Sequence, residues 1–162
     1  MPIPANDLDP AERARHEACM ARAIDAATGA DAPFGTVVVA RGGTEILCAG
    51  RNRGRTSPVL HGEMDALLNG ADADPAIDWT ATTLYTTGEP CPMCMSAAIW
   101  AGIPVIVYAT SIATLARLGA PQILLDADAV ARAAPFHSCR IIGGVLAART
   151  DPMFAAWLAA DP

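Results

Sequence analysis

The stretch that decides the fold is Leu84-Tyr85-Thr86-Thr87-Gly88-Glu89-Pro90-Cys91-Pro92-Met93-Cys94. The segment that leads into it, residues 82–86, is rich in threonine and apolar residues and predicts a β-strand. The apolar residues 93–101 predict a helix, and Pro92 stands where a proline costs no hydrogen bond, at the first helical position. We therefore expect Cys91 and Cys94 at a strand-to-helix junction, where the dipole of the helix N-terminus favours thiolates.

A pair of cysteines two residues apart suits tetrahedral zinc, because both thiolates can bind one ion without backbone strain. Thirty positions before Cys91 (91 − 61) the chain reads His61-Gly62-Glu63, at the start of a short helix predicted over 61–68. Residues i and i+2 do not share a helix face, so His61 and Glu63 converge on one site only if the helix points its N-terminal end at it. His61, Cys91 and Cys94 leave a fourth zinc position open, which is the catalytic pattern. Zinc lowers the pKa of bound water to about 7, and Glu63 is the carboxylate that can move its protons.

Simpler interpretations of these residues remain open from the motif alone. Cys91 and Cys94 form a redox pair in one alternative, which leaves His-x-Glu unexplained. In a second, the zinc is purely structural and needs a fourth protein ligand, for which no spacing in the sequence gives a preference. The candidates for that ligand are His16, His137, Cys19, Cys48 and Cys139.

The rest of the chain alternates helical and extended patterns. Helices are predicted over 10–28, 111–118 and 151–159, and strands over 36–40, 45–49, 104–109 and 140–143, the first two joined as a hairpin. Strand pairs followed by helix–strand alternation predict a mixed sheet with helices on both faces, a three-layer α/β/α sandwich. We expect residues 1–162 to form a single domain.

Composition narrows the chemistry and the partners. All eleven basic residues are arginine, and the net charge is −6. The absence of lysine excludes mechanisms that need an amine, and the negative net charge argues against nucleic-acid binding. Arg51, Arg53 and Arg55 occupy alternate positions. They either contact a phosphate or belong to a solvated loop, and we favour the loop. An odd number of cysteines, no leader-like N-terminus and no long apolar run predict a cytoplasmic protein without a membrane span.

These motifs resemble those of the zinc-dependent cytidine deaminase-like superfamily, in which His-x-Glu is paired with Pro-Cys-x-x-Cys. The sequence is most similar to bacterial guanine and nucleoside deaminases, and next to tRNA adenosine deaminases, over 32–38, 57–63 and 84–94. The resemblance implies a five-stranded mixed sheet and a homodimer. It also implies hydrolysis, with zinc-activated water attacking the amine-bearing carbon while Glu63 protonates the ring nitrogen and the departing ammonia. Asn52, Phe34 and Trp100 match positions that bind the base in relatives.

Three further positions bear on the substrate. Relatives that deaminate guanine often carry acids where this chain reads Gly119-Ala120-Pro121-Gln122, and the family's usual alanine between histidine and glutamate is Gly62. The segment 154–157 resembles a C-terminal tail that closes over the site, or else it packs on the core. Glu89 is expected to be a structural capping residue and not a catalytic one. We predict a hydrolytic zinc deaminase of a free nucleobase or nucleoside, with a purine such as guanine favoured. A pyrimidine deaminase, a tRNA adenosine deaminase and a non-catalytic zinc-binding interaction domain are the alternatives.

Overall fold

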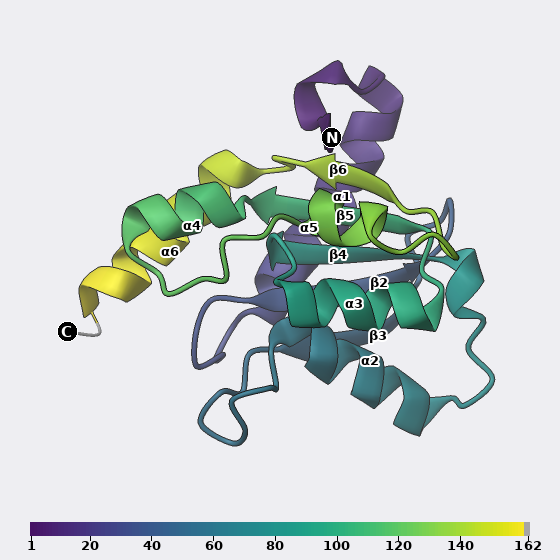
Figure 1. Ribbon diagram of the computed structural model, residues 1–162, viewed down its shortest axis with the longest axis horizontal. Helices are drawn as coiled ribbons and strands as arrows, with labels where there is room; N and C mark the ends of the chain where they lie inside the picture. The colour runs from purple at the N-terminus through teal and green to yellow at the C-terminus, as the bar shows by residue number, and fades with distance from the viewer. Residues whose placement is uncertain (161–162) are drawn as a thin grey trace.

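The computed structural model describes residues 1–160 and is built on one six-stranded mixed sheet (Figure 1). The strands lie in the order β1-β6-β5-β4-β2-β3. β4, β5, β6 and β1 are mutually parallel, whereas β2 pairs antiparallel with both β3 and β4. The strands are β1 (Ile3–Pro4), β2 (Gly35–Ala40), β3 (Ile46–Arg51), β4 (Thr82–Gly88), β5 (Val105–Thr110) and β6 (Arg140–Gly143).

Helices cover both faces of this sheet, which confirms the three-layer α/β/α prediction. One face is covered by α1, and the other by α2, α3 and the short α5, while α4 and α6 pack together beside the end of the sheet at which β4 and β5 finish (Figure 1). The helices are α1 (Pro10–Ala26), α2 (Gly62–Ala73), α3 (Pro92–Ala101), α4 (Ile112–Leu118), α5 (Ala127–Arg132) and α6 (Ala147–Ala160), with 3₁₀ turns at Ala5–Asp7 and Trp79–Ala81.

The central strands are buried on both faces because their residues alternate between two apolar cores. On β4, Tyr85 packs on the α1 side and Leu84 on the α2–α3 side. Neighbouring residues of β5, Val107 and Ile106, divide between the same two cores. A strand points successive side chains to opposite faces, so one apolar run supplies both layers. This arrangement fixes β4 rigidly at the centre of the sheet, directly before the cysteine motif.

Several boundaries differ from the sequence-based expectation. The sheet has a sixth strand, β1, which is only two residues long and pairs with β6. Helix α2 continues past Gly70 instead of ending there. A Cβ at Gly70 would come within 2.7 Å of the Trp79 ring and 2.8 Å of Cys48 Sγ, so the position needs a residue without a side chain. That glycine therefore permits close helix packing and does not end the helix. Helix α5 was not predicted, and α6 begins four residues before its expected start.

Among the described residues, no helix is long and apolar enough to cross a membrane.

Candidate metal and catalytic site

Two helix N-termini meet at one point beyond the end of β4. His61 is the N-cap residue of α2 and Cys91 is the N-cap residue of α3, with Pro92 as the first helical residue, as predicted. Cys94 lies in the first turn of α3 and is fully buried. The convergence that the spacing of these motifs required is therefore present. Helix dipoles at both N-termini favour negative charge at this point.

The three candidate ligands have the spacing of a tetrahedral zinc site. Among the described residues, one group of this kind is present, and its donor atoms all lie within 4.8 Å of one another. Cys91 Sγ lies 3.5 Å from His61 Nδ1 and 3.7 Å from Cys94 Sγ. Zinc bonds of about 2.3 Å to sulfur and about 2.0–2.1 Å to nitrogen, at tetrahedral angles, require separations of about 3.6 and 3.8 Å. His61, Cys91 and Cys94 therefore fit zinc and leave one coordination position free of protein.

The ligand set is also electrostatically prepared for a cation. A hydrogen bond from the Cys94 thiol, with help from His61, lowers the pKa of Cys91 to about 4 despite its burial. The same thiol–thiolate contact raises the pKa of Cys94, because the two sulfurs share one proton. The hydrogen bond to Cys91 raises the pKa of His61. A metal ion that displaced these protons would bind a thiolate that the protein already favours.

Glu63 lies beside the ligands, on the first turn of α2. Its side chain is buried, and Thr86 Oγ1 donates a hydrogen bond to Glu63 Oε1 at 3.2 Å. Burial raises the pKa of the Glu63 carboxyl, which suits a group that must both accept and donate a proton near neutral pH. Gly62 lets this turn sit against β2, since a Cβ there would come within 2.9 Å of the Phe34 carbonyl oxygen. Gly62 is thus seated tightly against the strand.

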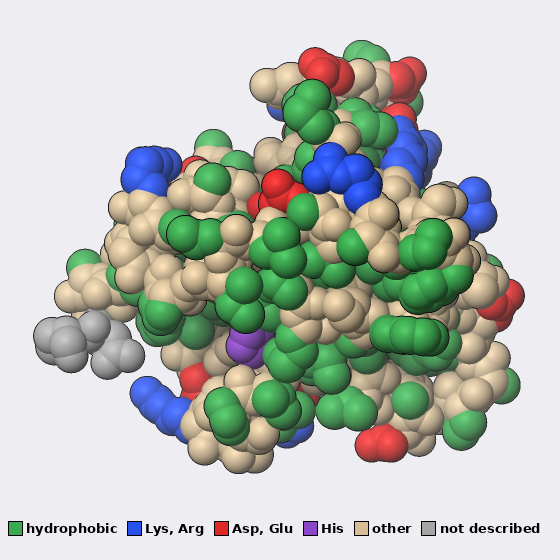
Figure 2. Space-filling model, in the orientation of Figure 1, with side chains coloured by type: hydrophobic (Ala, Val, Ile, Leu, Met, Phe, Trp, Pro, Cys, Tyr) green, Lys and Arg blue, Asp and Glu red, His purple; other side chains and the backbone are tan. Residues whose placement is uncertain are grey.

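A cavity of about 180 Å³ opens over this cluster. Phe34 and Asn52 line it, together with Glu63 and His61. The Phe34 ring lies nearly parallel to the His61 ring, with centroids 6.5 Å apart. Asn52 is held by hydrogen bonds from Gly54 N to its Oδ1 and from its own N to the Phe34 carbonyl. On the face shown in Figure 2, a histidine side chain lies in a hollow between apolar side chains.

Two residues of this cavity, Gln122 and Trp157, come from distant parts of the chain. Trp157 belongs to α6, whose Phe154 packs against Phe34 with ring centroids 4.7 Å apart. Helix α6 therefore packs on the core through Phe154, as one of the two expectations for the C-terminal segment had it, and borders the cavity through Trp157. Gln122 stands in the stretch where relatives often carry acids. Thr86, the hydrogen-bond partner of Glu63, went unrecognised in the sequence because a strand threonine gives no signal of that role.

The structure corrects the expectation for Trp100. Its side chain is 77% exposed and packs against Phe136, with ring centroids 4.9 Å apart, away from the cavity. The reason is helix geometry: α3 presents its cysteines at its N-terminal end, whereas Trp100 lies near its C-terminal end, where a rise of 1.5 Å per residue places it about 10 Å further along the axis. Within one chain, Trp100 does not line the base pocket.

Glu89 and the three alternating arginines have structural partners. Glu89 accepts hydrogen bonds from Ile112 N at 2.8 Å and from Ala127 N at 2.9 Å, so it caps the starts of α4 and α5, as expected. Arg51 donates to the Thr28 carbonyl, Arg53 pairs with buried Asp65 at 2.9 Å, and Arg55 donates its backbone N–H to Asp31. These contacts favour the loop interpretation of the arginines over a nucleic-acid contact.

The remaining histidines and cysteines take other partners. His16 Nδ1 is hydrogen-bonded to Tyr85, while His137 and Cys139 both contact the Ile103 carbonyl. Over residues 1–160, none of them joins the His61 cluster as a fourth ligand. This arrangement favours the open, catalytic type of zinc site over a closed structural one.

Comparison with known proteins agrees with this geometry. Residues 13–110 match the cytidine and deoxycytidylate deaminase zinc-binding region. The guanine deaminase of Bacillus subtilis is 32% identical over 133 residues, which cover 75% of this chain and 84% of that protein. A tRNA-specific adenosine deaminase of Streptococcus pyogenes is 40% identical over 51% of this chain and 52% of its own length.

A solved guanine deaminase structure, from Nitrosomonas europaea, superposes with a TM-score of 0.70 at 22% identity, covering 96% of this chain and 90% of that one. At this identity the match shows the shared fold. The zinc-ligand motif, the open coordination position and the extent of the sequence match lead to one conclusion: the chain belongs to the family defined by the cytidine and deoxycytidylate deaminase zinc-binding region.

Proposed function

We propose that the protein is a zinc-dependent hydrolytic deaminase that acts on a free nucleobase or nucleoside, with a purine such as guanine as the favoured substrate. The observation that carries this proposal is the placement of a buried, proton-carrying Glu63 beside an open three-ligand zinc site at the floor of a cavity. The similarity to guanine deaminase over most of both chains supports the purine class.

His61, Cys91 and Cys94 would hold the ion. Bound zinc would lower the pKa of water to about 7 and so supply the nucleophile for attack on the amine-bearing ring carbon. Glu63 would take one proton from the attacking water and pass it to the ring nitrogen next to the reacting carbon. It would then move the proton of the newly added hydroxyl group to the amine, so that the C–N bond breaks, ammonia leaves and the C=O bond forms. Thr86 holds Glu63 Oε1 during these transfers. The reaction replaces a C–N bond by a C–O bond and needs no further cofactor.

The cavity itself favours a base-sized substrate. Its volume of about 180 Å³ lies below the range of roughly 300–1,000 Å³ typical of pockets for drug-sized ligands. Phe34 offers an aromatic face, and Asn52 offers an amide to the polar edge of the base. Gln122 borders the same space with a group that both donates and accepts hydrogen bonds, whereas an ionised acid only accepts. We therefore expect the Gln122 side chain, through its amide oxygen, to contact the hydrogen-bond donors of a purine.

A substrate panel tests this assignment. Ammonia release is measured from guanine, adenine, cytosine and their nucleosides with zinc-loaded protein. We expect guanine or another purine to react and cytosine to stay unchanged. Turnover of cytosine without turnover of any purine would contradict the purine assignment, and tight tRNA binding at physiological salt would favour a tRNA adenosine deaminase.

We also propose that residues 1–162 form a single domain that works as a cytoplasmic homodimer. The exposed aromatic pair of Trp100 and Phe136 supports the dimer, because contiguous exposed apolar side chains often mark a protein–protein interface. The five free cysteines suit a reducing compartment. Analytical ultracentrifugation of the purified protein tests the dimer, and a monomeric mass at micromolar concentration would contradict it.

A further inference from the structure

A second cavity, lined by described residues, has no part in the proposed reaction. Its volume is about 480 Å³, compared with about 180 Å³ for the cavity over the metal ligands. It lies between α1, the β2–β3 hairpin, the first residues of β4 and β5, and the segment that leads into β6. The cysteine motif follows the opposite end of β4, so the two cavities lie at opposite ends of the sheet.

Three arginines border this cavity, and only one carboxylate offsets them. Arg140 pairs with Glu12, which is the acidic residue of the lining. Arg15 and Arg41 are exposed, and across residues 1–160 neither has a carboxylate oxygen within 4.0 Å. The cavity therefore has a local excess of positive charge in a chain whose net charge is −6. Unpaired guanidinium groups around a concavity attract an anion.

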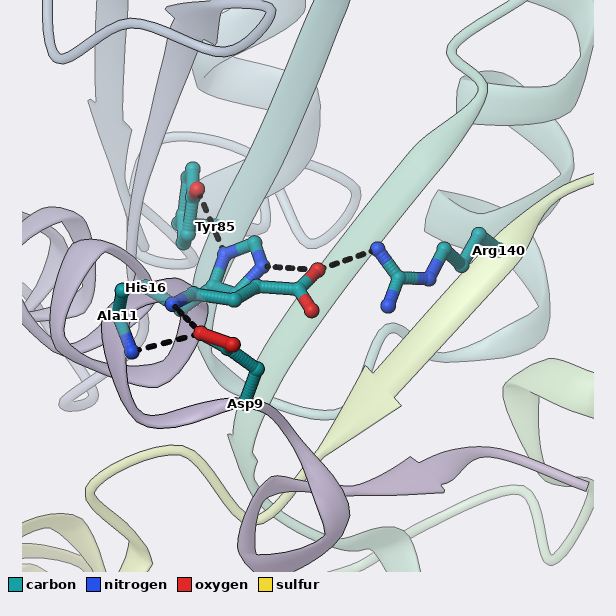
Figure 3. A network of polar contacts seen from close by, with 6 residues as sticks. Asp9, Ala11, His16, Tyr85 and Arg140 are labelled. Atoms are coloured by element: carbon teal, nitrogen blue, oxygen red, sulfur yellow. Dashed lines mark hydrogen bonds and ion pairs between the residues drawn. The ribbon is translucent and has the colours of Figure 1, made fainter.

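The inner wall of the cavity carries a buried histidine nitrogen that lacks a hydrogen-bond partner. His16 is 6% exposed, and its Nδ1 lies 2.9 Å from Tyr85 Oη (Figure 3). Its Nε2 makes one long contact, drawn dashed in Figure 3: Glu12 Oε1 lies 3.6 Å away, beyond hydrogen-bond distance, and already accepts a hydrogen bond from Arg140. Buried polar atoms are nearly always paired, so an orphaned nitrogen beside unpaired arginines indicates a missing partner.

We propose that this cavity is a second ligand site, which binds the phosphate group of a small phosphorylated molecule. The guanidinium groups of Arg15 and Arg41 hold the phosphate oxygens, and His16 Nε2 faces the remainder of the ligand or an oxygen of the same group. Guanidinium forks match phosphate geometry and bind it by charge-assisted hydrogen bonds. A concave volume of about 480 Å³ suits a small molecule, since pockets of this class span roughly 300–1,000 Å³, more closely than an extended nucleic-acid backbone.

Calorimetric titration of the zinc-loaded protein tests this site. The probes are inorganic phosphate, ribose 5-phosphate and ribose, of which the last has no charge. We expect both phosphate compounds to bind and ribose not to bind. Arg15→Ala and Arg41→Ala each weaken ribose 5-phosphate binding about tenfold or more, because each removes a charged hydrogen-bond donor. Arg22→Ala is the matched control, because it removes the same charge from an exposed position of α1 outside the cavity and leaves the affinity unchanged.

A second measurement follows the orphaned nitrogen directly. In nitrogen-15 NMR spectra, ribose 5-phosphate at a concentration near its wild-type Kd shifts the His16 imidazole resonance in the wild type and in Arg22→Ala, and the shift is several-fold smaller in Arg41→Ala at the same ligand concentration. Failure of both phosphate probes to bind at about 10 mM, a free energy of less than about 3 kcal/mol, overturns the proposal. Equal affinity in all variants overturns it as well, by moving the phosphate elsewhere. RNA binding that the same two arginine variants abolish would assign the surface to a nucleic acid instead.

Discussion

Single residues at the metal cluster each combine a structural and a chemical role. His61 and Cys91 occupy the N-cap positions of α2 and α3 and would also supply two of the three ligand atoms. Glu63 is buried one turn from these atoms, and its raised pKa follows from that burial more than from any neighbouring charge. We therefore expect this carboxyl group to carry protons in the reaction without binding the metal itself.

Replacing Glu63 with glutamine tests this division of labour. We expect Glu63→Gln to keep the zinc content of the wild type, since the ligands are unchanged, and to lower kcat by about 10²–10⁴-fold, the usual contribution of a general acid–base group. Zinc is measured by atomic emission and turnover by ammonia release. Glu45→Gln, which makes the same change at an exposed position of the β2–β3 hairpin, keeps full activity. If Glu63→Gln retained wild-type kcat, its assigned role would be wrong.

The residues that sequence reasoning located best are those whose chemistry depends on short spacing. His61, Cys91 and Cys94 were identifiable because zinc restricts both residue type and separation. Trp100 was misplaced because an aromatic residue at the far end of an apolar helix carries no information about which end of that helix meets the substrate. Thr86 was missed for a related reason, because its partner Glu63 is 23 residues away and only the sheet brings them together.

At the scale of elements, the site depends on how closely α2 approaches β3. Gly50 makes this possible, because a Cβ there would lie 2.1 Å from Ala66 N and 2.5 Å from the Gly62 carbonyl oxygen, both in α2. Neither backbone atom can move without moving the helix. The position of His61 and Glu63 is therefore set partly by a glycine on the neighbouring strand.

The substitution Gly50→Ala should therefore damage both stability and metal binding. We expect it to lower the free energy of unfolding by about 3 kcal/mol, a typical cost of overpacking, and to weaken zinc binding because α2 is displaced. Urea denaturation and zinc competition titrations measure the two effects. Gly43→Ala is the control, since its Cβ would meet nothing closer than 3.5 Å. Equal stability of the two variants would contradict the packing argument.

Glu89 links α4 and α5, and the loop between these two helices borders the catalytic cavity. It is buried and receives one backbone N–H from each of α4 and α5. We expect Glu89→Ala to lower the free energy of unfolding by about 2–4 kcal/mol, because two buried donors lose a charged acceptor. Asp126→Ala, which removes one exposed cap from Ala129 N, costs about 1 kcal/mol. Thermal and urea unfolding compare the two, and a smaller loss for Glu89→Ala than for Asp126→Ala would refute its double role.

Element prediction succeeded where a local pattern determined the structure. The strand around Leu84 and the helix after Pro92 follow from apolar runs with clear ends. Helix α5 was missed although Asp126 is a local N-cap, because its six residues are too few for a clear helical pattern; its second cap comes from Glu89, 38 positions away from Ala127 in sequence. Gly70 was taken as a helix end, although its role is to admit Trp79, which is a tertiary contact that no local pattern records.

At the scale of the whole molecule, the arginines near the two cavities differ in their partners. Arg53 and Arg55 near the catalytic cavity have acidic partners, whereas Arg15 and Arg41 at the opposite end of the sheet have none among the described residues. The acidic partners of Arg53 and Arg55 are consistent with an enzyme that takes a free base in preference to a tRNA, because paired arginines are less available to phosphate groups. The composition alone could indicate this preference but could not locate the charge.

The central claim is that the protein is a zinc-dependent hydrolytic deaminase. The most direct test titrates zinc into chelator-stripped protein and measures ammonia release from guanine. The reaction is run in water enriched in oxygen-18. We predict that activity rises in proportion to bound zinc, reaches its maximum at one ion per chain, and yields an oxo product that carries the solvent oxygen. Full turnover by the zinc-free protein, or no ammonia from guanine or any other base at full zinc occupancy, would contradict it.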